Sequence, residues 1–341
     1  MIDKLSALLR RVDVLLIGLA LAVSYLLVSY YGSPAAVAVV EDPPQLFPPS
    51  EQQSAPPDSA EPEAPRALSP VRFMMYNVQN YFLEEDKPRS RHARRIKTVQ
   101  ERENTADVIA SAKPQIVGLI EMGGPAALND LAERLAARGL HYPHRKVLTR
   151  WGEDRALAIL SMHPIVEDHS KADCDLVGQT NRRMLRGILD VTVKLKDKRQ
   201  YRILGVHLKA RVGDNPVAAQ ALRAREARTL AAHVQQVLRT RPSLPLLVFG
   251  DWNDGPADPA LAVMTQGSSR DTTLQRLKPE DARGESWTIY YKEGNEYSTF
   301  DQIYVNKALK KRMGNKAEMG IVSEEARKHS SDHRAVWCDL L

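Results

Sequence analysis

Short apolar runs that end in polar residues recur along residues 71–341, and their lengths and spacing are typical of β-strands. Stretches with apolar residues on one helical face separate several of these runs. The predicted helices are one that ends near residue 112 and two over residues 125–138 and 215–240. The predicted strands cover residues 71–77, 115–121, 156–161, 184–195, 201–209, 246–251, 287–291 and 298–305. This pattern predicts a layered α/β fold.

The predicted helix over residues 215–240 has the clearest boundaries. Asn215 is a favourable N-cap, and Pro216 suits the first turn of a helix. The apolar spacing would pack this helix on a sheet and leave Arg223, Arg225 and Arg228 toward solvent.

The run over residues 246–251 ends in a glycine and a carboxylate, and the rest of the chain repeats this arrangement. Gly250 permits a tight turn, so that Asp251 and Asn253 can project into one cleft. An Asx turn is the simpler interpretation of such a pair taken alone. Polar residues also lie at the ends of other predicted strands or next to them, namely Asn77, Glu121, His207, Asp301, Asp332 and His333.

The first 70 residues differ from the rest. Residues 14–31 are apolar except for glycine and serine, which is long enough for a membrane-spanning helix, and Lys4, Arg10 and Arg11 precede them. We expect residues 1–33 to form a signal anchor that leaves the remaining chain extracytoplasmic. The alternative is a secreted protein after signal cleavage near residues 36–38. The proline-rich residues 34–70 are expected to be an extended linker before a catalytic domain over residues 71–341.

The net charge indicates the kind of binding partner, and the cysteine content bears on disulfide bonds. The 341 residues carry a formal charge of +6, with −4 in residues 1–70 and +10 in residues 71–341. A basic body suits a polyanion, either nucleic acid or an anionic membrane surface, and the basic residues 89–102 could form a solvated helix face or contact phosphates. Cys174 and Cys338 exclude a disulfide framework, although a single bridge stays possible in an exported domain.

The candidate residues have side chains that suit phosphate chemistry. A glutamate after so apolar a run as residues 115–120 needs a partner, and Mg²⁺ prefers carboxylate and water oxygens. His207 is either a satisfied core histidine or a general acid, and a carboxylate beside His333 could orient it as a base. Glu153 or Asp154 is a candidate carboxylate partner for His207.

Six motifs in this order resemble those of the endonuclease/exonuclease/phosphatase superfamily, which is also called the deoxyribonuclease I-like fold. They are Y-N-V-Q-N, L-I-E-M, G-V-H-L-K, F-G-D-W-N-D, F-D-Q-I-Y-V and S-D-H-R-A-V, and the resemblance spans residues 71–341. The resemblance implies a four-layered α-β-β-α sandwich of two mixed sheets.

The resemblance also implies a role for each candidate residue. Glu121, Asn77 and Asp332 would belong to the Mg²⁺ site, with Mn²⁺ or Ca²⁺ as substitutes. His333, oriented by Asp301, would activate water or stabilise charge on phosphorus. Asp251 would orient the attacking water, Asn253 would donate to a phosphoryl oxygen, and His207 would protonate the leaving oxygen.

These expectations describe a membrane-tethered, Mg²⁺-dependent phosphodiesterase, with nucleic acid as the expected substrate and no protein partner indicated. The alternative within the same fold is a phosphohydrolase of lipid or inositol phosphates, which a membrane anchor would suit. An inert binding module is the rival from another class, and the presence of all the motif residues favours the enzyme.

Overall fold

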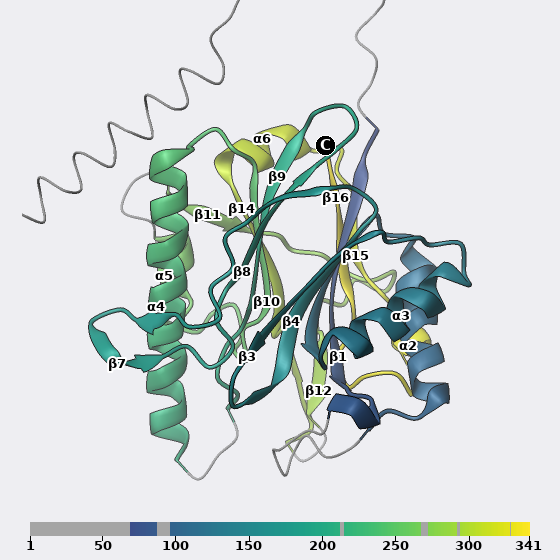
Figure 1. Ribbon diagram of the computed structural model, residues 1–341. Coiled ribbons are helices and arrows are strands. Elements are labelled where there is room, and N and C mark those ends of the chain that lie inside the picture. The colour runs from purple at the N-terminus through teal and green to yellow at the C-terminus, as the bar shows by residue number, and fades with distance from the viewer. Residues whose placement is uncertain (1–68, 87–95, 212–214, 267–271, 292–293, 328) are drawn as a thin grey trace, which may run out of the picture. The chain divides into compact units, whose positions relative to one another are not determined.

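The structure is a computed structural model that describes residues 69–341 except 87–95, 212–214, 267–271, 292–293 and 328. Two six-stranded mixed sheets pack face to face, and helices cover their outer faces (Figure 1). The predicted α-β-β-α sandwich is therefore confirmed for the described part of the chain.

The first sheet contains the first and last strands of the domain. Its order is β15 (Met319–Ile321), β16 (Val336–Leu340), β1 (Val71–Tyr81), β2 (Ile116–Met122), β4 (Glu153–Ser161) and β3 (His144–Arg150). Two helices pack on its outer face, α2 (Val99–Ala112) and α3 (Pro125–Ala136). A short 3-10 helix, η1 (Glu84–Asp86), follows β1, and α7 (Glu324–Arg327) lies between β15 and β16.

The second sheet contains the strand predicted over residues 246–251. Its order is β11 (Leu274–Arg276), β14 (Asp301–Asn306), β10 (Leu246–Asp251), β9 (Gln200–His207), β8 (Leu189–Lys194) and β5 (Ile165–Asp168). The outer helices are α4 (Pro216–Thr240) and α5 (Ala262–Thr265), and α6 (Lys307–Met313) follows β14. Two hairpins lie outside the sheets, β6 (Asp175–Leu176) with β7 (Gln179–Arg183) and β12 (Ile289–Tyr291) with β13 (Glu296–Ser298).

The core is built from side chains that alternate across each strand. In β1, Phe73 and Met75 face the second sheet, whereas Met74 and Tyr76 pack under α2 and α3. The ring of Phe249 in β10 occupies the space between the sheets. A Cβ atom added at Gly118 of the facing strand would lie 2.4 Å from this ring, so the close approach of the two sheets requires glycine there.

The described helix α4 confirms one sequence prediction and corrects another. The Asn215 side chain accepts a hydrogen bond from the Ala218 amide, as expected of an N-cap. The prediction that Arg223 faces solvent is wrong, because its side chain is 4% exposed and pairs with Asp254 in the loop after β10. Arg228 is exposed, as predicted.

Two other predictions change in detail. The strand predicted over residues 184–195 begins only at Leu189, because the chain bends at Gly187, whose φ is +69°. Cys174 and Cys338 are both free, so the single bridge left open by the sequence does not form. Cys338 is buried between the sheets.

The predicted anchor over residues 1–33 and almost all of the predicted linker lie outside the described residues. Among the helices that the structure does describe, none combines the length and apolar character needed to cross a membrane.

The sheet topology gathers the ends of four strands. β1 runs parallel to β2, and β9 runs parallel to β10. β14 is antiparallel to β10, with Asp251 opposite Asp301. The carboxyl ends of the parallel strands and the start of β14 therefore meet at one end of the sandwich, where the predicted site residues lie.

Candidate active site

Asp251, at the end of β10, is the centre of a connected set of polar side chains and is 1% exposed. Its Oδ2 accepts a 3.0 Å hydrogen bond from Asn77 Nδ2 and lies 3.6 Å from His207 Nε2 and 3.8 Å from His333 Nε2. Its Oδ1 accepts a 2.9 Å hydrogen bond from the backbone amide of Asn253. One carboxylate therefore contacts four other residues predicted to form the site.

His333 lies in the segment before β16 and is held from two sides. Its Nδ1 is 2.7 Å from Asp301 Oδ2, and since a carboxylate only accepts, this nitrogen carries the proton. Its backbone amide donates to Ser331 Oγ, and that hydroxyl donates over 2.7 Å to the backbone oxygen of Asn77. The orientation of the imidazole is thus fixed by both sheets.

Burial and neighbouring charges shift the pKa of three of these groups in different directions. Burial raises the pKa of Asp251 to about 7, although the nearby His333 lowers it. Burial alone would lower the pKa of His333, but Asp301 and the other nearby carboxylates raise it well above its usual value. Burial, with Arg186 as the next cause, lowers the pKa of His207 well below its usual value. Burial therefore favours the neutral form of His207, whereas the carboxylates around His333 favour its charged form.

Glu121 ends β2 with an unusual backbone conformation, a φ of +62°. Its Oε2 accepts a 3.1 Å hydrogen bond from the Asn80 amide and lies 3.2 Å from Arg155 Nε, while its Oε1 lies 3.8 Å from His207 Nε2. Arg155 Nε also donates to Asn80 Oδ1 over 2.7 Å. Asn80 and Arg155 thus fix the Glu121 carboxylate. Asn80 is the last residue of the motif Y-N-V-Q-N, whereas no feature of the sequence marks Arg155.

Asp332 and Asn77, which the sequence assigns to the same ion as Glu121, carry the oxygen donors that a hard cation prefers. Asp332 Oδ1 is buried and has no hydrogen-bond partner among the described residues, and its nearest charged neighbour is His333 Nε2 at 3.9 Å. Asn77 Oδ1 accepts from the Gln79 amide. Within the described part of the chain, no three His, Cys, Asp or Glu side chains are placed to hold a metal ion together. Two carboxylates and an amide, completed by water, fit a divalent cation that keeps part of its hydration shell.

The turn after β10 is fixed by a second group of charges. Asn253 has a φ of +51°. Its side-chain Nδ2 donates a 3.0 Å hydrogen bond to the backbone oxygen of Leu208. The second N–H of this side-chain amide is left for a ligand. The next residue, Asp254, accepts 2.7 Å hydrogen bonds from Arg223 and Arg211 and is buried. Sequence analysis assigned no role to Asp254, although it belongs to the motif F-G-D-W-N-D.

The contacts of His207 differ from those suggested by the sequence. The described carboxylates within 4 Å of its ring are Glu121 and Asp251, and Glu153 lies instead 3.4 Å from Arg186 Nε. Arg186 is 7% exposed, and its Nε and one terminal nitrogen lack a hydrogen-bond partner among the described residues. A buried guanidinium with unused N–H groups beside the site is suited to an anionic group of a substrate.

A model of the Endonuclease/Exonuclease/phosphatase family matches residues 76–333 of the chain, a range that contains all the site residues. The chain belongs to this family. It is accordingly a hydrolase that acts on phosphoric ester bonds, and enzymes of this family generally use divalent metal ions. The resemblance seen in the sequence is thus confirmed.

Solved structures of the same fold were also found. The human Nocturnin catalytic domain with bound sulfate has 18% identity and a TM-score of 0.54, with 80% of this chain and 94% of that chain covered. Truncated Caenorhabditis elegans TDP2 has 15% identity and a TM-score of 0.53 over 80% and 97% of the two chains. An endonuclease/exonuclease/phosphatase from Bacteroides vulgatus has 16% identity and a TM-score of 0.56 over 80% and 99%. No curated protein sequence matches the chain.

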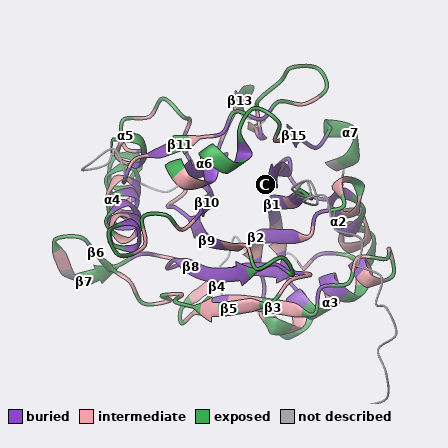
Figure 2. Ribbon diagram, turned by 90° about the horizontal axis from the view of Figure 1, so that it is seen from above, coloured by how far each residue is buried: buried purple, intermediate pink, exposed green. Residues whose placement is uncertain are grey.

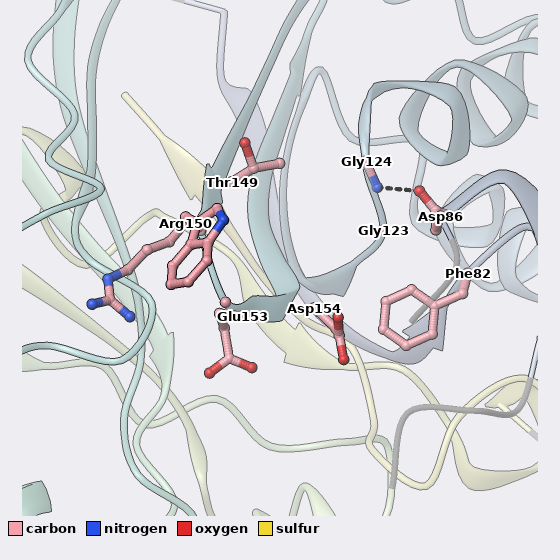
Figure 3. A pocket seen from close by; sticks show the side chains of 10 residues that line it. Phe82, Asp86, Gly123, Gly124, Thr149, Arg150, Glu153 and Asp154 are labelled. Atoms are coloured by element: carbon pink, nitrogen blue, oxygen red, sulfur yellow. Dashed lines mark hydrogen bonds between the residues drawn. The ribbon is translucent and has the colours of Figure 1, made fainter. Parts of the chain in front are cut away.

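This family member has a pocket of about 420 Å³ beside the end of β2 (Figure 3). Gly123 and Gly124 form one wall, where the Gly124 amide donates to Asp86 Oδ1 over 2.6 Å. The turn between β3 and β4 forms the other wall, and its Trp151 is 88% exposed. The pocket therefore offers an aromatic ring one strand away from Glu121.

A second aromatic group lies on the hairpin of β12 and β13 and just before it. The rings of Trp287 and Tyr297 are 4.9 Å apart, and those of Tyr297 and Tyr290 are 4.6 Å apart and stacked. Ile289 in this hairpin pairs with His333 through a β-bridge. The three rings are thus tied directly to the segment that carries His333.

Proposed function

We propose that this enzyme is a Mg²⁺-dependent phosphodiesterase that cleaves nucleic acid, DNA or RNA, by in-line attack of water. The observation that carries the proposal is the position of Asp251, whose Oδ2 lies within 4 Å of the imidazole nitrogens of both His207 and His333. A phosphodiester is anionic and resists attack, so hydrolysis needs an oriented water, a compensating positive charge and a proton donor.

The side chains divide these tasks between them. Asp251 is fixed by Asn77 and Asn253 and would orient the attacking water. His333, held by Asp301, would place its positive charge beside the phosphoryl oxygens, and His207 would pass a proton to the leaving oxygen. The low pKa of His207 in the free enzyme would rise once an anionic phosphate lies beside it.

The metal ion would be held by Asn77, Glu121 and Asp332. A bound Mg²⁺ ion supplies positive charge that neutralises the phosphate. The Asn80 amide and Arg155 keep the Glu121 carboxylate in one orientation, which lowers the cost of organising the site.

The aromatic side chains support nucleic acid as the substrate. Trp151 lines the pocket beside the end of β2, and a second aromatic group belongs to the hairpin that pairs with His333, namely Trp287, Tyr297 and Tyr290. Every nucleotide presents a flat base next to its phosphate, and stacking on aromatic rings is tolerant of sequence. A lipid or inositol phosphate has no such ring.

The location of the enzyme is also part of the proposal. An anchor over residues 1–33 and a linker over residues 34–70 would tether the catalytic domain to the extracytoplasmic side of a membrane. Mass spectrometry of the mature amino terminus distinguishes this anchor from a cleaved signal.

Hydrolysis by the purified full-length chain tests the substrate. Supercoiled plasmid, RNA, sphingomyelin and inositol phosphates are each incubated with Mg²⁺ or with EDTA, and His333→Ala serves as the inactive control. We expect metal-dependent cleavage of plasmid or RNA that the variant lacks, with a rate that falls steeply as salt rises. Turnover of the lipid or the inositol phosphates with intact plasmid and RNA would refute the proposed substrate but retain the mechanism.

A matched pair of variants tests the stacking argument. Trp151→Ala should slow cleavage of nucleic acid about tenfold or more, because stacking contributes roughly 1–3 kcal/mol per base. Hydrolysis of bis-p-nitrophenyl phosphate, which has no base, serves as the reference reaction. Val177→Ala removes another exposed apolar side chain, one on the turn between β6 and β7, and should change neither rate.

A further inference from the structure

A large cluster of positive charge lies at the end of the sandwich opposite the active site. Three short segments hold eleven Lys and Arg residues and one Asp, a net charge of +10, which equals the whole excess of residues 71–341. The segments are the β8–β9 turn (residues 194–200), the connection from α4 to β10 (residues 239–245), and α6 with the residues that follow it (residues 307–316). We call these segments the basic end.

The register of the strands places these segments side by side. Lys194 in β8 pairs with Gln200 at the start of β9, and β10 starts beside β9 with Leu246 opposite Arg202. β14 ends beside the start of β10 and leads directly into α6. Lys198, Arg241 and Arg312 line one groove of about 480 Å³, so all three segments meet there.

Most of the Lys and Arg side chains of the basic end are exposed, and the three segments contain a single acidic residue, Asp197. Asp197 pairs with Arg199, and Glu167 of β5 pairs with Arg241. The exposed cations include Lys194, Lys196, Lys198, Arg239, Lys311, Arg312 and Lys316. Figure 2 looks onto this end of the molecule and shows exposed residues in α6. The next acidic residue, Glu318, contacts Arg72.

The domain is also joined to the preceding chain at this end. β1 starts there with Val71 opposite Leu340, and Arg199 donates a 2.7 Å hydrogen bond to the backbone oxygen of Ser69 (Figure 1). The catalytic side chains lie at the other end of the same strands, so the basic end is separate from the substrate site around Asp251.

We propose that the basic end docks on a bilayer that contains anionic phospholipid. Lys and Arg residues that cluster near the surface of an anionic bilayer are attracted to it through their summed charge. The docked domain would present its active site away from the bilayer, toward soluble substrates. The proposal goes beyond the catalytic function, and it rests on surface charge and strand direction rather than on the predicted anchor.

Energy transfer to labelled lipids tests this orientation in the full-length chain. In a Cys174→Ser background, Asn315→Cys places a dye at the basic end and Tyr291→Cys places it at the active-site end. The chain is added to nanodiscs of phosphatidylcholine with or without 30% phosphatidylglycerol, each containing an acceptor lipid. We expect efficient transfer only from the dye at residue 315, only with phosphatidylglycerol, and at least several-fold weaker transfer in 0.5 M NaCl.

Charge reversal supplies the specific control. One variant reverses four charges of the basic end and should abolish the phosphatidylglycerol-dependent transfer; it combines Lys196→Glu, Lys311→Glu, Arg312→Glu and Lys316→Glu. A second variant reverses charges on β7 and α4 and should retain most of the transfer; it combines Arg182→Glu, Arg225→Glu and Arg228→Glu. Unchanged hydrolysis of bis-p-nitrophenyl phosphate verifies that each variant is folded. If a variant does not fold, the dependence of energy transfer on salt in the chain with its basic end unaltered still tests whether the docking is electrostatic.

Two results would overturn the proposal. One is transfer that does not differ between phosphatidylcholine and phosphatidylglycerol or does not respond to salt. The other is a charge-reversed basic end that loses binding of duplex DNA while its transfer to phosphatidylglycerol is unchanged, because the surface would then serve a nucleic acid.

Discussion

The Nδ1 atom of His333 and the Oδ2 atom of Asp301 lie 2.7 Å apart and join the segment before β16 to the first residue of β14. The two elements belong to different sheets, so this contact crosses the sandwich. It fixes the ring so that its other nitrogen, Nε2, faces Asp251. The carboxylate also stabilises the positive charge that the buried imidazole carries.

Asp301→Asn should therefore impair catalysis without unfolding the domain. An amide can hold the ring in place but cannot balance its charge, and loss of one acid/base group typically costs ~100- to 10,000-fold in kcat. The double variant Asp301→Asn/His333→Ala should be no slower than His333→Ala alone, since the two residues act as a unit. Multiplicative losses in the double variant would contradict this coupling.

Removal of the Glu121 carboxylate should weaken metal binding more than it affects the fold. Glu121→Gln keeps the size of the side chain and removes the charge, so we expect the affinity for Mn²⁺, read by electron paramagnetic resonance, to fall about tenfold or more. Glu153→Gln is the matched control, because Glu153 contacts Arg186 rather than the proposed metal position. Equal Mn²⁺ affinity in the two variants would contradict the assignment of Glu121.

The strand-end positions of the site could be predicted because they depend on local sequence. An apolar run that ends in a polar residue indicates where a strand stops, and Glu121, His207 and Asp251 do lie at or next to strand ends that parallel pairing brings together. Asn77 lies inside β1 instead, because this strand continues to Tyr81 past a shift in its register. The pairing of Asp301 with His333 followed from the family resemblance. The structure brings all eight predicted residues into one network, while their individual roles stay predictions.

Other features depend on contacts between segments far apart in the chain. Arg155 meets Glu121 only because β4 pairs with β2, and Arg223 is buried only because Asp254 folds back onto α4. Helical spacing alone placed Arg223 toward solvent. The net charge of +10 could be counted from the sequence, but its location at the end opposite the site depends on strand direction.

The contact between Gly118 and Phe249 predicts a destabilising substitution with a specific rescue. Gly118→Ala would place a Cβ atom 2.4 Å from the Phe249 ring, and such overpacking costs roughly 1–3 kcal/mol of unfolding free energy. Gly255→Ala is the control, because nothing lies within 4 Å of its added Cβ atom. Denaturant titration should show that Gly118→Ala/Phe249→Leu recovers part of the loss. A double variant less stable than either single variant would refute the steric explanation.

The buried Asp190 predicts how stability depends on pH. Burial alone would raise its pKa, but hydrogen bonds from His233 and Arg202 lower it below the unfolded value of ~3.9. The ionised carboxylate therefore stabilises the fold above pH ~4, and this contribution is lost as pH falls through the lower folded pKa. Asp190→Asn should cost about 3–5 kcal/mol at pH 7, because it leaves the buried Arg202 guanidinium with only its 3.4 Å contact to Glu167, and should flatten the acid limb of the stability curve.

Asp197→Asn is the matched control for this prediction, since it removes a carboxylate that also pairs with an arginine but is 39% exposed. Its cost should be about 1 kcal/mol or less, because water and salt screen an exposed pair. Urea titrations at pH 3, 5 and 7 compare the two variants with the unaltered chain. Equal losses in both variants would mean that burial does not strengthen the Asp190 interaction. A loss for Asp190→Asn that is as large at pH 3 as at pH 7 would mean that its charge is not the source of the stability.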